Sequence, residues 1–550
     1  MVVARKNPGA TAEMVAAHFP VSQVQLLASK PLDERARRRV PPGVVTDVCT
    51  SLDEMLLRIV GHPAPQLLID AIPGAGAGKV KRFRELSFAL ADGGAYLAID
   101  AANADRGEDS LASELARLMS LQGWEDAGTS DEWFDERLRK NIASVSSEGP
   151  AVLVGKFGRH YLNLREEVTT PVLMRRYGTS WGRELMVRPA ETFRSKIEVT
   201  ANVEDPEQRF PNELHVPPLY LREYVDVVCA PRQVVVTGSL VLSASFHHPS
   251  VPRPRNRMLP SASKRFAETD IGPDDAQPLP GTYFHLDSEY PGLFGHMYTE
   301  DIARLWGWEL AKRLYPQLRI LRSAEDPENG PAPYELETLR AYGIAEHDIV
   351  CIDRPVRAER LVTASQEFHN GAVIYVSEHL SETWSRLRDG LRTSSGPRYD
   401  KIFIARPDVK RSCLNSEQVE AAFASHGFEV LRPELLPLPE QAELFATARV
   451  IAGYAGSGMF GMIHCEQPGT RIVISSDMYS ARDVFLISAL KGDDFHYIAC
   501  PTRVPDASRL DAAPKGVDPT RPHSQTTLLY DFEFDFDRDG DALEKLLAST

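Results

Sequence analysis

A glycine-rich segment late in the chain has the residue types that hold a phosphate. The run Ala448–Ala452 is expected to be a buried strand, and Gly453-Tyr454-Ala455-Gly456-Ser457-Gly458 separates it from an expected helix over Met459–His464. Glycines at such a junction let the backbone approach a phosphate, and the helix N-terminus offers free N–H groups and the positive end of its dipole. By itself, such a loop is equally typical of a simple connection between a strand and a helix that binds no ligand.

Two arginines precede this segment. Arg406 ends the expected strand Lys401–Ala405, and Arg411 follows five residues later. Guanidinium groups form charge-assisted, often bidentate hydrogen bonds with phosphate oxygens. We therefore expect both arginines to bind the same diphosphate as the loop.

A candidate acid–base pair lies earlier in the chain. His296 and Glu300 are four residues apart, so they share one face of a helix. Either group can take a proton from a hydroxyl nucleophile when it is correctly placed. The alternative is that Glu300 and Asp301 are ordinary acids in the first turn of a helix.

The first part of the chain, residues 1–165, predicts a Rossmann-like domain. Expected strands Val24–Ala28, Val44–Val48, Leu67–Ala71 and Ala95–Asp100 alternate with expected helices Ser51–Val60 and Val80–Ala91. The stretch Ala91–Asp100 resembles the late part of a class I methyltransferase sheet. No glycine-rich loop follows the first expected strand, so we interpret the domain as degenerate or structural.

The rest of the chain predicts two further α/β lobes. Residues 166–395 begin with short strands (Val225–Cys229, Gln233–Val236 and Leu240–Ser243) and contain a Pro/Arg-rich loop over 249–280. Residues 396–525 form the second lobe, and 526–550 add a strand and a helix. Two successive α/β units of this size indicate facing Rossmann-like lobes with a cleft between them.

The order of these elements resembles family 61 glycosyltransferases (DUF563-like). The resemblance covers roughly residues 215–505 and includes Asn415, Gln441 and the pair Pro468-Gly469 besides the motifs above. It implies an inverting enzyme of GT-B fold that needs no metal. It also implies a set of donor-binding residues: Arg406, Arg411, Asn415, Gln441, Gly453, Tyr454, Gly456, Ser457 and Gly458.

The same resemblance assigns the base. Family members place an aspartate at the position of Glu300, so we expect Glu300 to act as the base, with His296 orienting it or acting in its place. The chain departs from the family at three points. Ala455 stands where many members have a histidine, Gly461 where they often have asparagine, and Ser475-Ser476 where a glutamate is common.

Together these features predict an α/β protein: a GT-B-type pair of facing lobes preceded by an additional N-terminal Rossmann-like domain. The expected reaction is transfer of a hexosyl or pentosyl group from a nucleotide-sugar to a hydroxyl of a glycan, as in polysaccharide biosynthesis. We expect the donor to be a UDP-sugar. Two alternatives stay open. One is a non-catalytic nucleotide-sugar or glycan-binding protein, and the other is a methyltransferase that binds S-adenosylmethionine in the N-terminal domain.

Composition limits the partners and the location. The 550 residues carry a net charge of −15, which argues against a protein held on nucleic acid by bulk electrostatics. Six scattered cysteines and no long apolar run favour a cytoplasmic protein without a transmembrane segment, able to reach the inner membrane as a peripheral protein. A homodimer is an open alternative.

We expect no metal and no cofactor besides the nucleotide-sugar substrate. His247, His248 and His285 have no third ligand at metal spacing and are interpreted as loop or surface histidines. Gly74–Lys79 imitates a phosphate loop, but Val80 stands where Ser or Thr is needed. Asp535, Asp537 and Asp539 imitate a calcium loop, but Leu546 replaces the required glutamate.

Overall fold

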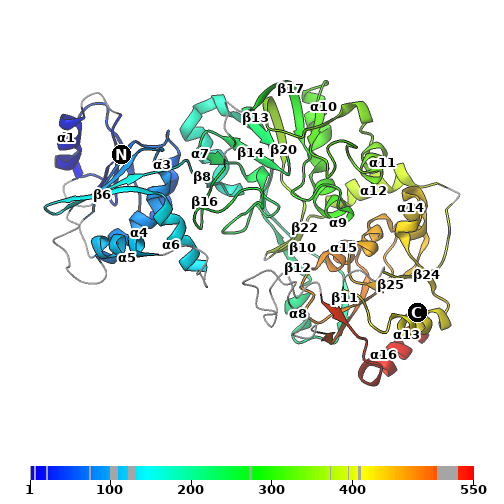
Figure 1. Ribbon diagram of the computed structural model, residues 1–550. Helices are drawn as coiled ribbons and strands as arrows, with labels where there is room; N and C mark the ends of the chain where they lie inside the picture. Colours follow the sequence, from blue (N-terminus) through cyan, green and yellow to red (C-terminus); the bar gives the residue numbers. More distant parts are fainter. Residues whose placement is uncertain are drawn as a thin grey trace.

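The chain is a mixed α/β protein built on three large sheets. The computed structural model describes residues 2–4, 8–19, 23–72, 76–99, 110–121, 130–269, 271, 276–371, 373–393, 396–406, 411–503 and 530–550. Figure 1 shows the N-terminal part (blue to cyan) at one end, a central part (green) and a C-terminal part (yellow to red) at the other end.

The N-terminal sheet has seven strands in the order β3-β2-β1-β4-β5-β7-β6. Strands β1 to β5 run parallel, whereas β7 is antiparallel to both β5 and β6. The strands are β1 (Val2–Ala4), β2 (Gln25–Ala28), β3 (Val45–Val48), β4 (Leu67–Ala71), β5 (Ala95–Ala98), β6 (Ile142–Glu148) and β7 (Ala151–Lys156). The helices are α1 (Pro8–His18), α2 (Glu34–Arg38), α3 (Leu52–Val60), α4 (Gly76–Leu86), α5 (Leu111–Ser120) and α6 (Ser130–Lys140).

This part confirms the four expected strands to within two residues. The expected helix after Ser51 is also present, because the Ser51 side chain accepts the Glu54 N–H and caps its first turn. Strand β1 was not predicted, since three residues are too few to show a periodic pattern. Of the imitated phosphate loop, residues 73–75 lie outside the described residues.

The central sheet is mixed, which differs from the expected Rossmann-like first lobe. Its order is β16-β8-β15-β14-β13-β20-β17-β18-β19, and β9 also pairs with β13. Strands β13, β14 and β15 are antiparallel because their connections are too short for a crossover. Strands β20, β17, β18 and β19 form a parallel block, and β15 also pairs in parallel with β8. The strands are β8 (Tyr161–Asn163), β9 (Gly182–Arg188), β13 (Leu219–Ala230), β14 (Val234–Thr237), β15 (Leu240–Val241), β16 (Phe266–Ala267), β17 (Gln277–His285), β18 (Arg319–Arg322), β19 (Ile349–Cys351) and β20 (Val356–Ala364).

The C-terminal sheet is entirely parallel, in the order β11-β27-β26-β25-β23-β24. Its strands are β11 (Glu198–Ala201), β23 (Lys401–Ile404), β24 (Glu429–Leu431), β25 (Val450–Tyr454), β26 (Thr470–Ser476) and β27 (Asp494–Cys500). Its helices are α13 (Ser416–Ser425), α14 (Leu438–Thr447), the 3₁₀ helix η9 (Ser457–His464), α15 (Asp483–Lys491) and α16 (Phe536–Ser549). Because β24 and β25 lie on opposite sides of β23, the strand order reverses direction between β23 and β25. Ligands of doubly wound sheets bind at this switch point.

Two strands pair with a sheet outside the domain in which we expected them. Strand β8, expected in the first domain, pairs with β15 and β16 of the central sheet. Strand β11, expected in the second, pairs with β27 of the C-terminal sheet. Each covers an edge that would otherwise expose unpaired backbone groups, and a local sequence pattern does not reveal such distant pairing.

The apolar cores also run across the boundaries between sheets. One core joins Phe284 and Leu305 of the central part to Phe445, Met459 and Phe485 of the C-terminal part. A second core joins Leu27 and Leu56 of the N-terminal part to Tyr224 and Tyr283 of the central sheet. The central part is therefore packed against both of its neighbours.

Candidate functional site

The glycine-rich loop and Arg406 meet at the switch point of the C-terminal sheet. Arg406 follows β23, the loop follows β25, and Arg406 Nη1 donates to the Ala455 carbonyl at 2.7 Å. Gly456 has φ +146°, and a Cβ there would lie 2.7 Å from Arg406 Nη1 and 3.7 Å from Arg411 Nη2. Glycine is thus required by the backbone conformation, and a Cβ would also displace the Arg406 guanidinium, whereas Arg411 lies at ordinary contact distance.

The two arginines form a concentrated positive charge. In the described part of the chain, neither forms an ion pair with a carboxylate; Arg411 lies over the ring of Tyr479, with its guanidinium carbon 5.0 Å from the centroid. Burial, and then the charge of Arg411, lowers the pKa of Arg406 to about 10, so it remains protonated at neutral pH. Two adjacent cations without acidic partners suit a polyanionic group such as a diphosphate.

A cavity of about 660 Å³ opens beside this loop. The predicted donor residues Arg406, Gln441, Ser457 and Gly458 line one side, and Phe294 and Tyr334 of the central part line another. Its volume falls in the range of small-molecule and cofactor pockets. The helix after the loop is a 3₁₀ helix that starts at Ser457, not at Met459 as expected, so its first N–H groups belong to the loop itself.

Five of the nine predicted donor residues do not line this cavity: Arg411, Asn415, Gly453, Tyr454 and Gly456. Asn415 bonds the C-terminal segment: its Nδ2 donates to the Phe534 carbonyl at 2.8 Å, and its Oδ1 accepts the Phe534 N–H at 2.9 Å. Tyr454 packs in the core between Phe403 and Phe532. Side chains alternate across a strand, and this alternation turns Tyr454 away from the cavity. Gly453 packs against β23, where a Cβ would lie 2.7 Å from the Ile404 carbonyl oxygen.

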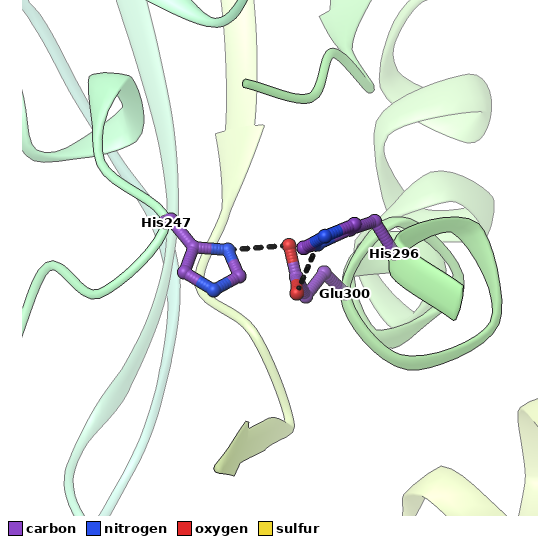
Figure 2. A group of neighbouring side chains, drawn as sticks. All are labelled: His247, His296 and Glu300. Atoms are coloured by element: carbon purple, nitrogen blue, oxygen red, sulfur yellow. Dashed lines mark hydrogen bonds and ion pairs between the residues drawn. The ribbon is translucent and has the colours of Figure 1, made fainter. Parts of the chain in front are cut away.

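His296 and Glu300 form a hydrogen-bonded pair, as their spacing predicts. His296 Nδ1 lies 2.8 Å from Glu300 Oε1, and Glu300 is buried (Figure 2). The chain here changes from the short helix α9 (Phe294–His296) to a π-helix, η5 (Met297–Asp301), before the 3₁₀ turn η6 (Ile302–Gly307). Short π segments inside helices are frequent at functional sites.

A third residue, His247, completes this cluster. Its Nδ1 lies 2.5 Å from Glu300 Oε2, so the carboxylate is held by an imidazole on each side (Figure 2). Burial alone would raise the pKa of Glu300, but the charges of His247 and His296 and their hydrogen bonds place it well below its usual range. Burial lowers the pKa of His296, and the charge of Glu300 more than compensates, leaving it raised.

His247 and His248 lie in a loop, as expected, but are half-buried, whereas the interpretation of His285 as a loop or surface histidine is wrong. His247 contacts Glu300; His248 packs against His247 and His369, with ring centroids 3.9 and 4.2 Å away, and burial lowers its pKa to about 2. His285 is buried at the end of β17, and burial lowers its pKa to about 4. Local spacing missed the cluster because His247 and Glu300 are joined only by the tertiary fold.

The cluster also has the composition of a metal site. His247, His296 and Glu300 each offer a ligand atom, and these atoms lie within 4.8 Å of one another. Two histidines and one carboxylate suit zinc or iron. Among the described residues, Glu191, Glu378 and His379 form the other such group, away from the loop. The expected absence of a metal therefore needs a direct experiment.

The acid–base cluster and the phosphate loop come from different sheets but lie together. A Cβ on Gly295 would be 3.2 Å from Ser457 Cβ and 3.3 Å from Phe460 Cε2. On the same side, Asn370 Nδ2 donates to Asp483 Oδ1 of α15 at 2.5 Å, and burial raises the pKa of Asp483 to about 6. The site is thus built at the contact between the central and C-terminal parts.

Most residues of this site lie in a segment whose sequence matches a known protein family. Residues 294–473 match the family Glycosyltransferase 61, which includes α9, the acid–base pair, Arg406 and the glycine-rich loop. The matched segment is about a third of the chain, and it is similar to this family. The matched family is one of glycosyltransferases, enzymes that transfer a sugar from a donor to an acceptor.

The chain is also similar in part to solved structures of a methyltransferase. These structures are of the MycE methyltransferase from the mycinamycin biosynthetic pathway. The identities are 17% with TM-score 0.22 (complex with Mg and SAH, crystal form 1) and 17% with TM-score 0.24 (crystal form 2). The match covers 28% of this chain and 44% of the MycE chain, which is less than half of that protein. No curated protein sequence matches the chain. Among the described helices, none combines the length and the apolar character needed to span a membrane.

Proposed function

We propose that this protein is a family 61 glycosyltransferase, an inverting enzyme that moves a sugar from a UDP-linked donor to a glycan hydroxyl without a metal ion. The observation that carries the proposal is the cavity of about 660 Å³. The switch-point loop and Arg406 bound it on one side, and the helix that carries His296 bounds it on the other. In this proposal the C-terminal sheet is the donor lobe of a GT-B pair, and the central part is the acceptor lobe.

The leaving group would be stabilised by the arginines. As the bond between the anomeric carbon and the phosphate oxygen breaks, negative charge develops on the diphosphate. Arg406 and Arg411 are fixed beside Gly456 before the reaction, so no reorganisation is needed when this charge appears. This replaces the role that a divalent cation has in other nucleotide-sugar enzymes.

The geometry favours His296 as the residue that accepts the proton, with Glu300 as its hydrogen-bond partner. Both oxygens of Glu300 are engaged by imidazoles and its pKa is lowered, so it is a weak base. With Nδ1 directed at Glu300, the opposite ring nitrogen of His296 is left to accept the proton. The acceptor oxygen would attack the anomeric carbon, its proton would pass to His296, and Glu300 would stabilise the imidazolium.

The departures from the family leave a second function to be tested. Ala455 replaces the common loop histidine, and in this chain its backbone carbonyl holds Arg406. The loss does not remove the phosphate-binding groups, but it removes a side chain from the donor loop. A protein that binds the donor without transferring the sugar is therefore the competing proposal.

Calorimetric titration with UDP, GDP and S-adenosylmethionine, each with and without EDTA, tests the proposal. We expect UDP binding that survives EDTA and is lost in Arg406→Ala. A transfer screen with UDP-sugars then separates catalysis from binding alone. Binding of S-adenosylmethionine without any nucleotide would contradict the proposal and assign the activity to the N-terminal domain.

A further inference from the structure

Three exposed arginines lie close together in a loop segment beside the acid–base cluster. Arg253, Arg255 and Arg257 alternate with buried Pro254 and Asn256. Asn256 fixes this alternation, because its Nδ2 donates to the carbonyls of Arg232 at 3.0 Å and Ser245 at 2.8 Å. Since the residues between them are buried, the three arginine side chains all lie on the solvent side of this segment.

Arg257 connects the segment to the catalytic cluster. His247, which holds Glu300, lies ten residues before Arg257. The Arg257 guanidinium carbon lies 4.7 Å from the centroid of the Tyr290 ring, and this ring stacks on His296 at 4.5 Å with an interplanar angle of 17°. Two successive ring contacts therefore connect the last arginine of the row to the proposed proton acceptor.

These charges are not neutralised by ion pairs within the described chain. None of the three forms an ion pair with a carboxylate of the described chain, whereas Arg265 of the same loop pairs with Asp53 at 2.5 Å. Glu289, the carboxylate beside Arg257, is buried and accepts the Arg257 backbone N–H at 2.7 Å. In a chain of net charge −15, an unpaired row of three cations is a local reversal of sign.

We propose that Arg253, Arg255 and Arg257 bind an anionic glycan acceptor, one that carries carboxylate or phosphate groups on the sugars next to the hydroxyl that is modified. The inference rests on the proposed transfer function and specifies its acceptor. Guanidinium groups bind both carboxylates and phosphates through paired N–H donors. The position of Arg257 places the first negative charge close to His296, and the other two arginines bind charges further along the polymer.

The test is a binding titration of the full chain with four probes. Oligogalacturonate carries carboxylates, phosphorylated dextran carries phosphates, dextran is neutral, and duplex DNA is a polyanion without the sugar chemistry. The variant Arg253→Gln/Arg255→Gln/Arg257→Gln is compared with a control of equal charge change, Arg37→Gln/Arg313→Gln/Lys545→Gln. All six positions are exposed.

We expect wild type and control to bind one or both anionic glycans at least tenfold more tightly than dextran, a preference lost in the variant. Comparing the affinities for oligogalacturonate and phosphorylated dextran identifies which anion is bound. Equal binding of dextran, equal binding of DNA, or unchanged binding by the variant would overturn the inference.

A parallel UDP titration separates the two proposals. UDP binding within twofold of wild type in the variant shows that the variant is folded and its donor site intact. If anionic glycans bind but no protein binds UDP, the donor proposal fails and the glycan site stands. If UDP binds and the glycan preference is absent, the acceptor inference alone is wrong.

Discussion

Gly295 and Ser457 are in contact across the boundary between the central and C-terminal parts. A Cβ added to Gly295 would lie 3.2 Å from Ser457 Cβ, closer than most such contacts. Gly295 precedes the proposed proton acceptor, His296, and Ser457 opens the helix that follows the phosphate loop. The two halves of the site can therefore approach this closely because residue 295 has no side chain.

Enlarging residue 295 should separate the two halves of the site. In Gly295→Leu the added side chain has to displace Ser457 or Phe460, so we expect kcat/KM for sugar transfer to fall at least about tenfold. Gly78→Ala is the control, since a Cβ there meets only Arg82 Nη1 at 3.4 Å and alanine is favoured inside a helix. Unchanged kcat/KM in Gly295→Leu would contradict a site shared between the two parts.

Removal of Arg406 should weaken donor binding. Loss of hydrogen bonds to a charged group costs about 2 kcal/mol, so Arg406→Ala should raise the Kd for UDP roughly 30-fold. Arg449→Ala, which removes an exposed arginine paired with Asp400, is the control and should bind UDP as wild type does. Because the pKa of Arg406 is about 10, wild-type affinity should decline as the pH rises through that value.

Replacing Glu300 should move the acid limb of the pH profile. Transfer requires unprotonated His296, so activity is lost as the pH falls through the pKa of this histidine. Glu300 raises that pKa, whereas burial lowers it. In Glu300→Gln we expect kcat to fall about 10²-fold or more, the residual activity to persist to lower pH, and UDP affinity to be unchanged.

The control for Glu300 is Glu309→Gln, which removes an exposed carboxylate paired with Arg386. Its profile should match wild type. The His296 proton chemistry can also be measured by NMR titration of the imidazole. A His296 pKa that does not fall in Glu300→Gln would show that the pair is not coupled as proposed.

Asn415 should act on stability and not on donor binding. Asn415→Ala removes two hydrogen bonds to Phe534, and we expect the free energy of unfolding to drop by about 1–3 kcal/mol. The Kd for UDP, measured well below the unfolding temperature, should stay within twofold of wild type. A large loss of UDP affinity without loss of stability would instead support the role that the family resemblance implies.

Removal of metal should leave transfer intact. After dialysis against EDTA we expect the transfer rate to remain within twofold, because the arginines carry the leaving-group charge. Elemental analysis of the purified protein is the direct measurement. Suppose that the protein contains one equivalent of zinc or iron, that His247→Ala loses it, and that chelation abolishes activity. These results would show that His247, His296 and Glu300 form a metal centre.

Local sequence patterns determined much of this protein. The alternation of strands and helices, the glycine loop after β25, Arg406 at the end of β23 and the spacing of His296 and Glu300 all depend on residues close in sequence. Backbone conformation and helical periodicity act over a few residues, so these features could be predicted without knowing the fold. The position of Ser51 as a helix cap is of the same kind.

Only the tertiary structure decided which distant residues meet. The placement of His247 on Glu300, the contact of Gly295 with Ser457 and the pairing of β11 with β27 all join segments separated by long stretches of chain. The orientation of Tyr454 and Asn415 away from the cavity also depends on packing against the C-terminal segment. Such contacts depend on how the sheets and their apolar cores pack together, and no local pattern records that packing.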